Sequence, residues 1–534
     1  MLRRLTAIGV FLLAIAPSAY LAWTLRSMPH LGYYHDDGIY WVSAKSLAEG
    51  GGYRIPSLPA DPYQTKYPPL YPALLAGIWK LNPSFPGNLP DATLLAWLCL
   101  PLVLFALWHL LSRYGFDFPR RCALLIVAGW SPVVAVFSFS LMPELLFTAL
   151  LLLSLILAER AGADDAPMLA AFAGMAAALA YLTKSIAAPL LITVPACFLL
   201  RRRAKSGMMF FATMAPAVAG WQWWVARHMT HAQDRVSLYY TNYLGFQIYN
   251  VPLEDLGLVI WHNLDTALMG IGRLLTFDVP VGSKHLERVI AVAAIAGAVR
   301  LTRRTGLLQY PVAALGMAML LLIWHYPPDQ RMVFPLYPLL LAGLLTELEN
   351  IRQALAASWR KPAFADRTAA AAGAGLLAAL ASFVGFTTIY GLGWFLPSLF
   401  GAYRADLDAR RPAYAWISAN APRDANLYAY DDPLLYLYTG RRSCSIPIPS
   451  KFGYHNNDAG IDRLLDATAD FAHEQHLDFV LLTSDEFYRD LHERGAARLK
   501  KAVDTSGVFA AVFHSGGVTV YRYQGEQASL RRGL

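Results

Sequence analysis

Apolar runs of membrane-spanning length, separated by short arginine-rich connectors, most constrain this chain of 534 residues. Apolar residues make up 56% of it and charged residues 15%, against about 45–50% and about 25% in soluble domains. This excludes a soluble enzyme, and with 13% aromatic residues and 4 Cys it also excludes a disordered chain and a disulfide scaffold. The runs predict about eleven transmembrane helices. Their approximate limits are 6–25, 91–112, 121–139, 144–158, 168–183, 186–200, 208–226, 287–301, 307–325, 332–347 and 369–397.

The basic residues occur in every second connector, as in the pair Arg3-Arg4 and the clusters within 201–205 and 300–304. This is the positive-inside pattern of a multi-pass membrane protein. A nucleic-acid surface would instead gather its charge on one soluble face, so the net charge of +8 does not indicate a nucleic-acid partner. The pattern predicts a cytoplasmic N-terminus and a C-terminal region outside, in the inner (cytoplasmic) membrane. The first apolar run also has the features of a cleavable signal peptide, and either interpretation places the next segment outside.

Three long regions are then predicted on the outer side: 27–90, 227–286 and 400–534. The second is typical of amphipathic helices that lie on the membrane surface. The third changes to short strands and helices, typical of a small soluble α/β domain. We therefore expect a mainly α, polytopic membrane domain over 1–399 and an extracytoplasmic α/β domain over 400–534. The expected strands are 426–431, 478–484, 509–515 and 518–523, and the expected helices are 461–475 and 486–494.

Polar residues that a membrane protein does not need for folding gather in the first outer region. Asp36 and Asp37 follow the first apolar run and lie among tyrosines that include Tyr34 and Tyr40. A carboxylate there could act as a general base. The alternative is that the pair only caps the helix predicted to follow it.

Four further charged residues are predicted on the same side of the membrane. Lys66 precedes the rigid segment "YPPLYP", Glu144 opens the fourth apolar run, Lys184 lies between two runs, and Arg331 precedes the tenth. Lysine and arginine at this depth can bind a phosphate, or they can snorkel to the interface. Glu144 can simply favour a helix N-terminus, and Arg331 can pair with Asp329.

These residues resemble the GT-C glycosyltransferases. The acidic pair, "KYPPLYP", "PELLF", "YLTKS" and "QRMVFPLYPLLL" occur in the order found in the branch of protein O-mannosyltransferases and lipid A aminoarabinose transferases. An outward C-terminal α/β domain also resembles that branch. The aminoarabinose transferases usually carry an acidic residue directly before their lysine, whereas Thr65 stands before Lys66 here, so the match to that activity is poor.

The resemblance implies a sugar donor carried on a polyprenyl phosphate and a catalytic acid at Asp36. The second acid of the pair is often glutamate in the family and is Asp37 here, which we also expect at the catalytic site. We expect Lys66, Arg331 and Lys184 to bind the donor phosphate. We expect Glu144, Tyr34, Tyr40 and Tyr67 to contact the substrate.

The chemistry of glycosyl transfer fits these residues. A sugar leaving from a phosphate needs charge stabilisation on the leaving group, and the attacking hydroxyl needs one carboxylate as general base. Single displacement with inversion needs only one carboxylate, whereas a retaining mechanism would need two held close together, so we expect inversion. Should the acidic pair be only a cap, the base would be sought at Glu144 or Asp278. No ligand spacing is diagnostic of a metal site, so no cofactor is expected to be required, with a divalent metal left open.

Two other classes remain as alternatives. A transporter or flippase would carry charges near the midplane of its spans, whereas here they lie at one rim. A polysaccharide polymerase or ligase would leave the "KYPPLYP" loop unexplained. The expected partners are the polyprenyl-phosphate sugar, membrane lipids and a hydroxyl acceptor on a protein, lipid or glycan.

Overall fold

The computed structural model describes residues 2–525 apart from 233, 277–283, 362, 485 and 488–492. The described chain is mostly helical, and its strands all lie in the C-terminal third. It divides into two compact units, each built from segments far apart in the sequence. The first unit comprises Met1–Arg26, Thr93–Gln222 and Leu256–Ser398, and the second comprises Ser27–Ala92, Trp223–Asp255 and Leu399–Leu534.

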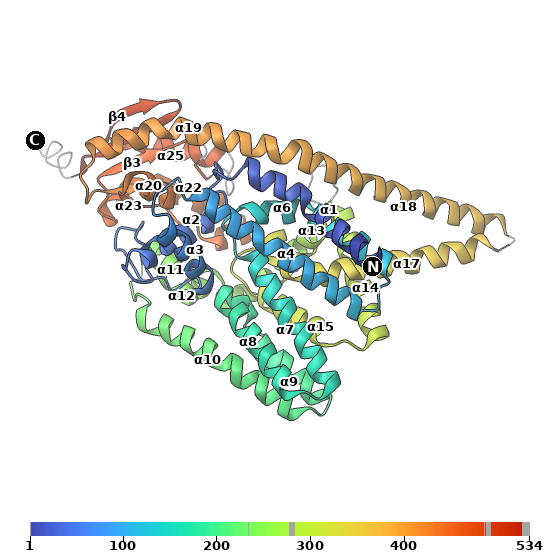
Figure 1. Ribbon diagram of the computed structural model, residues 1–534. Helices are drawn as coiled ribbons and strands as arrows, with labels where there is room; N and C mark the ends of the chain where they lie inside the picture. Colours follow the sequence, from blue (N-terminus) through green and yellow to red (C-terminus); the bar gives the residue numbers. More distant parts are fainter. Residues whose placement is uncertain are drawn as a thin grey trace, which may run out of the picture. The chain divides into compact units, whose positions relative to one another are not determined.

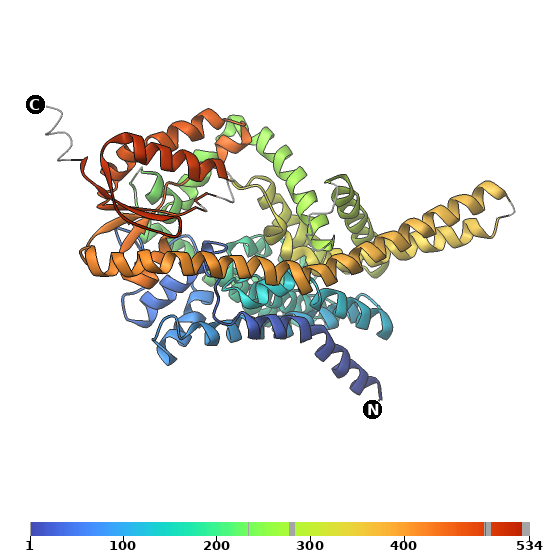
Figure 2. The same ribbon diagram turned by 90° about the horizontal axis from the view of Figure 1, so that it is seen from above.

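Long apolar helices make up the first unit. A Cβ on Gly297 would lie 1.9 Å from the carbonyl oxygen of Gly343, so α14 (Lys284–Thr305) and α17 (Tyr337–Trp359) pack backbone to backbone. In Figures 1 and 2, α17 and α18 (Phe364–Tyr390) run side by side as a long antiparallel hairpin. The remaining elements are α1 (Leu2–Thr24), α4 (Leu89–Arg113), α5 (Phe118–Gly129), α6 (Pro132–Phe139), α7 (Glu144–Asp164), α8 (Pro167–Thr183), η1 (Ser185–Ala187), α9 (Leu190–Leu200), α10 (Ala204–His228), α13 (Leu256–Thr276), α15 (Gln309–Leu322), α16 (Gln330–Val333), η3 (Phe334–Leu336) and η4 (Gly391–Phe395).

All eleven apolar runs expected from the sequence fall on helices, which identifies a multi-pass membrane protein. Among the described residues, five helices are long and apolar enough to cross a membrane, or six if the bent pair of α5 and α6 forms one span. Helices α8, α9 and α15 are apolar but short, and α10 and α14 do not qualify as spans. The expected number of eleven spans is therefore not confirmed. The five are Arg3–Thr24, Leu89–Arg113, Glu144–Asp164, Gln330–Trp359 and Phe364–Asn420.

The second unit joins a sheet to helices from both earlier loops. Its helices are α2 (Asp36–Ala48), α3 (Leu70–Leu81), α11 (Arg235–Thr241), α12 (Tyr243–Asn250), η2 (Leu253–Asp255), α19 (Leu396–Asn420), α20 (Asp432–Thr439), α21 (Ser450–Tyr454), α22 (Asp458–Asp466), α23 (Thr468–Glu474) and α25 (Glu493–Ser506). Its strands are β1 (Asn426–Tyr428), β2 (Arg442–Cys444), β3 (Phe479–Leu482), β4 (Phe509–Ser515) and β5 (Val518–Tyr523).

The five strands form one sheet with the order β2-β1-β3-β5-β4, in which β2, β1 and β3 are parallel and the β5 pairings are antiparallel. Side chains alternate between its two faces, as the pleat of a strand requires. Val480 and Leu482 pack with α22, α23 and α25, whereas Phe479 and Leu481 pack with α19. Ile39 of α2 belongs to the first of these cores. The first loop is therefore part of the same folded unit as the sheet.

The four expected strands are confirmed. Of the two expected helices in this region, one was wrong and the other lies largely outside the described residues. The helix expected over 461–475 is two helices, α22 and α23. The buried Thr468 hydroxyl donates to the Leu465 carbonyl (2.5 Å) and so competes with helix continuation at this break. The helix expected over 486–494 falls largely on residues outside the described ranges. Strand β2, which has three residues and no run of alternating apolar residues, was not predicted.

Thiol labelling tests the expected orientation. Ala60, Ala497 and Ala204 are exposed, so a cysteine at each position in a variant lacking the four native cysteines reports topology. On intact spheroplasts, A60C and A497C are expected to react with a membrane-impermeant maleimide, and A204C only after permeabilisation. Labelling of A204C alone on intact spheroplasts would show that the orientation is the opposite of the predicted one. Ser57 is unsuitable for this test because its side chain is completely buried.

Candidate active site

Asp37 closes a tight turn before α2. Gly32 has a φ of +92°, a conformation that favours glycine. The Asp37 carboxylate accepts hydrogen bonds from the backbone N–H groups of Gly32 (3.1 Å) and Gly38 (2.9 Å), and the residue is 1% exposed. Its position in the first turn of α2 is also favoured by the helix dipole. The surroundings of Asp37 are thus those of a residue that holds the turn.

Asp36 has a different environment. It is half-buried, and its Oδ1 accepts a short hydrogen bond from the hydroxyl of Tyr67. Burial, and then the negative charge of Asp36, raise the pKa of Tyr67 well above its usual value, so the phenol remains a donor. This bond orients a carboxylate that is still partly accessible.

Tyrosines surround this carboxylate. The Tyr40 ring lies 4.7 Å from that of Tyr67 and 5.6 Å from that of Tyr71, between centroids. Tyr34 contacts Tyr33 edge-on at 4.7 Å. Tyr40 therefore packs against the tyrosine that donates to Asp36, whereas Tyr34 contacts its neighbour in sequence.

Lys66 lies in a cage of tyrosine rings. Its Nζ is 3.6 Å from the ring centroid of Tyr239, 5.0 Å from that of Tyr243 and 5.2 Å from that of Tyr67. Tyr239 and Tyr243 come from the second loop, on α11 and α12. The sequence did not indicate this cage, which stabilises the ammonium by cation–π attraction.

A buried carboxylate from the C-terminal segment joins the first loop. Asp432, the first residue of α20, is completely buried, and its Oδ1 lies 2.7 Å from His35 Nε2. The Tyr240 hydroxyl donates to the same oxygen at 2.9 Å. Sequence reasoning missed both Asp432 and Tyr240. The one signal available was that Asp432 directly follows the strand expected over 426–431. Only the structure shows that this strand is parallel to its neighbours, with its carboxyl end where functional residues often lie.

His35 is protonated more readily than an ordinary histidine. Burial lowers its pKa, but the charge of Asp432 and the hydrogen bond to it raise the pKa, as does the charge of Asp36, and the net shift is upward. With its side chain 24% exposed, the imidazole keeps access to solvent.

In the first unit, three expected site residues converge. Glu144, at the start of α7, is completely buried, and its Oε1 lies 2.8 Å from Lys184 Nζ and 3.9 Å from Arg331 Nε. Lys184 follows α8 and Arg331 lies on α16, so the cluster joins three separate parts of the chain. One negative and two positive side chains give it a net positive charge.

The second carboxylate oxygen of Glu144 is buried without a hydrogen bond. Glu144 Oε2 is buried and has no hydrogen-bond partner, and the same is true of the hydroxyl of Thr148, one turn further along α7. A buried carboxylate oxygen without a donor is costly unless a ligand or water satisfies it. The cluster is therefore suited to hold a polar group beside its cations.

The nine expected site residues thus separate by unit. Asp36, Asp37, Lys66 and the three tyrosines belong to the second unit, and Glu144, Lys184 and Arg331 to the first. The alternative base Asp278 lies outside the described residues. Within the described ranges, no group of three or more His, Cys, Asp or Glu side chains is arranged to hold a metal ion.

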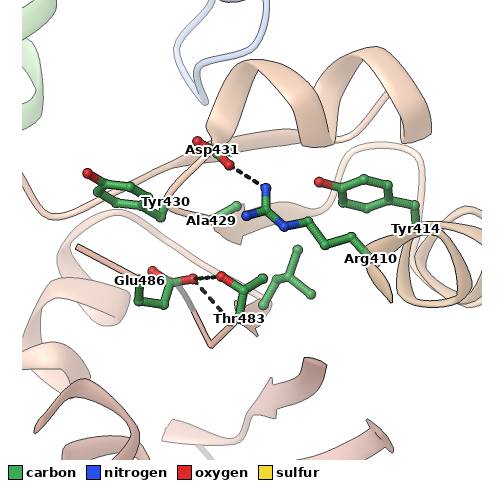
Figure 3. A pocket seen from close by; sticks show the side chains of 8 residues that line it. Arg410, Tyr414, Ala429, Tyr430, Asp431, Thr483 and Glu486 are labelled. Atoms are coloured by element: carbon green, nitrogen blue, oxygen red, sulfur yellow. Dashed lines mark hydrogen bonds and ion pairs between the residues drawn. The ribbon is translucent and has the colours of Figure 1, made fainter. Parts of the chain in front are cut away.

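A small pocket also lies at the carboxyl ends of β1 and β3 (Figure 3). Arg410 is ion-paired with Asp431 there, and Glu486 accepts hydrogen bonds from the hydroxyl (3.1 Å) and backbone N–H (3.2 Å) of Thr483. Its cavity volume of about 10 Å³ has room for about one water molecule and is far below the roughly 300–1,000 Å³ of ordinary ligand clefts. We assign it no part in the chemistry.

No family model matches the chain, and no curated protein matches it. Among solved structures, the oligosaccharyltransferase from Archaeoglobus fulgidus in its apo form is 13% identical, with a TM-score of 0.50 over 96% of this chain and 74% of that chain. ArnT from Cupriavidus metallidurans bound to undecaprenyl phosphate is 12% identical, with a TM-score of 0.48 over 94% and 97%. At such identities a likeness shows the fold alone. The likeness to the archaeal enzyme confirms that the chain has the GT-C fold that its sequence motifs implied.

Proposed function

We propose that this protein transfers a sugar from a polyprenyl phosphate to a hydroxyl group at the outer face of the cytoplasmic membrane. The observation that carries the proposal is the convergence of Lys184 and Arg331 on the buried Glu144 in the first unit. Three separated segments bring two positive charges to one completely buried carboxylate, at a cost that a structural role does not require. An anionic lipid headgroup is the ligand chemistry that suits it.

The leaving group of such a reaction is a phosphate. Negative charge grows on it as the glycosidic bond breaks, and fixed cations stabilise that charge. Lys184 and Arg331 are cations of this kind in the first unit, and Lys66 is one in the second unit. Glu144 Oε2, which has no partner, can accept a hydrogen bond from a hydroxyl of the bound sugar.

The acceptor hydroxyl must lose its proton as it attacks. Asp36 is the carboxylate we assign to this step, because it is oriented by Tyr67 and remains partly accessible. Asp37 is assigned to the turn. A single base suffices for direct displacement, so the product has inverted configuration at the anomeric carbon.

The domain division and the acceptor also belong to this proposal. The expected division into a membrane domain over 1–399 and an extracytoplasmic domain over 400–534 stays a prediction. The acceptor is a hydroxyl on a protein, a lipid or a glycan. An oligosaccharyltransferase shares the fold, but fold alone does not give function, so the site residues carry the proposal.

Mass spectrometry of lipids that copurify with the protein is the direct test. A polyprenyl-phosphate sugar should be found, and the purified protein should transfer that sugar from the same lipid to an acceptor in an envelope extract. A copurified lipid-linked sugar that is moved across vesicles but never transferred would identify a flippase instead.

The tyrosine cage offers a second prediction, on donor use. Y239F keeps the ring that faces Lys66, and Y239L removes it, so only Y239L should weaken the positioning of the ammonium. We expect Y239L to raise the donor KM by roughly 2- to 30-fold, the range of a cation–π contact of about 0.5–2 kcal/mol, and Y239F to leave it near that of the unmodified protein. K66A should raise the donor KM further and also lower kcat. Equal effects of Y239F and Y239L would show that the hydroxyl, and not the ring, matters.

A further inference from the structure

The second unit brings three distant segments together at one buried carboxylate. Asp432 Oδ1 contacts His35 from the first loop (2.7 Å) and Tyr240 from the second loop (2.9 Å), and Ser57 Oγ lies 3.5 Å from Oδ2. The Tyr240 hydroxyl is also 3.2 Å from His35 Nε2. Asp432 has no exposed surface.

A carboxylate this deeply buried is costly unless a cation and hydrogen bonds compensate it. Of the groups in contact with it, His35 is the one that can carry a positive charge. The other titratable and charged groups around His35 are Tyr240 on α11, Asp36 on α2 and Lys66 in the segment before α3. The two carboxylates favour an imidazolium at His35, and Lys66 opposes it.

We propose that Asp432 is a positioning residue for the catalytic step: through His35 it holds a positive charge beside Asp36 and thereby sets the basicity of Asp36. The proposal rests on the proposed function, in which Asp36 takes the proton of the acceptor hydroxyl. An adjacent imidazolium stabilises the carboxylate form of Asp36, and its loss makes Asp36 bind a proton more tightly. The C-terminal segment thus takes part in the chemistry through a residue that never contacts the substrate.

A double-mutant cycle tests this coupling. D432N and H35Q each keep a hydrogen-bonding side chain but remove one charge of the pair. Both should shift the acidic limb of the kcat/KM profile for the copurified lipid-linked sugar to higher pH, so the loss should be greatest at acidic pH. The double variant should be no worse than either single variant, because contacting residues couple by roughly 2- to 150-fold. Additive losses, or an unshifted profile, would overturn the proposal.

A second readout does not depend on activity. Diethylpyrocarbonate modifies only neutral imidazole, so the pH dependence of modification at His35, followed by peptide mass spectrometry, reports its protonation. In the unmodified protein the midpoint should lie above the usual value of a histidine, and in D432N it should fall below it, because burial then dominates. His455, which contacts Asp255 at 2.9 Å, is an internal reference for the extent of modification.

D431N is the matched control. It removes the neighbouring carboxylate, which pairs with Arg410 and not with His35. The melting temperature can fall in both variants, but only D432N should shift the pH midpoint of His35 modification. An equal shift in D431N would contradict the proposal. If D36N stays active while D432N still moves the His35 midpoint and the pH profile, the assignment of the base fails but the coupling stands. If the His35 midpoint does not respond to D432N, the proposal fails whichever residue is the base.

Discussion

D36N is expected to reduce turnover by about 10²–10⁴-fold, the usual contribution of a positioned general base. Asparagine keeps the size of the side chain, and its amide oxygen can still accept the hydrogen bond of Tyr67. It cannot take a proton from the acceptor. The melting temperature and the binding of undecaprenyl phosphate should therefore change little, and the loss should appear in kcat.

D37N provides the contrast on the adjacent residue. Both carboxylate oxygens of Asp37 accept backbone N–H groups, and an amide nitrogen cannot replace one of them. One buried N–H then loses its partner, at a cost of about 1–3 kcal/mol in the free energy of unfolding. D37N should lower the melting temperature with a smaller loss of turnover than D36N.

Two outcomes of comparing D36N with D37N would contradict the assignment of Asp36 as the base. If D37N is folded and inactive while D36N is active, the base is the second residue of the pair. If both variants are folded and active, the pair only favours the N-terminus of α2, and Glu144 becomes the next residue to test.

Local features of this protein could be predicted from its sequence. The apolar runs mark their own helices, because a segment of that hydropathy has few other stable conformations. Alternating apolar residues marked four of the five strands, and "KYPPLYP" put Lys66 and Tyr67 in the same outer loop as Asp36. The lengths of the spans were less predictable. Helices α8 and α15 are shorter than the bilayer core requires, and Phe364–Asn420 continues well beyond it.

Contacts between distant segments could not be predicted. His35 and Asp432 are 397 positions apart, and nothing in either local pattern indicates the other. The sequence placed Glu144, Lys184 and Arg331 at one rim of the membrane, but their separation depends on how α7, α8 and α16 pack. The role of Asp37 depended on two backbone N–H groups, and backbone hydrogen bonds of a turn leave little trace in residue type. Such contacts can be known only from the folded structure, and they determine that Asp36 is partly accessible whereas Asp37 is buried.

The cluster in the first unit yields the second large prediction, in which two substitutions act in opposite directions. R331Q removes one of two cations but leaves the closer pair of Glu144 and Lys184 intact, so the fold should tolerate it. It should lower kcat/KM for the donor by roughly 10- to 150-fold, the range of a charged hydrogen bond of about 1.5–3 kcal/mol. E144Q instead raises the positive charge of the cluster and should tighten the binding of undecaprenyl phosphate.

Opposite signs separate a phosphate site from a structural ion cluster. In a purely structural cluster, both variants would lower the melting temperature, and any change in lipid affinity would follow that loss in the same direction. K184M is a less suitable variant, because it leaves the fully buried Glu144 with its nearest charge 3.9 Å away and should destabilise the protein by about 3–5 kcal/mol. Titration of R331Q and E144Q with undecaprenyl phosphate, alongside thermal melts, therefore decides the matter. Weaker binding in R331Q and tighter binding in E144Q would assign the cluster to the lipid phosphate, whereas weaker binding in both would contradict that assignment.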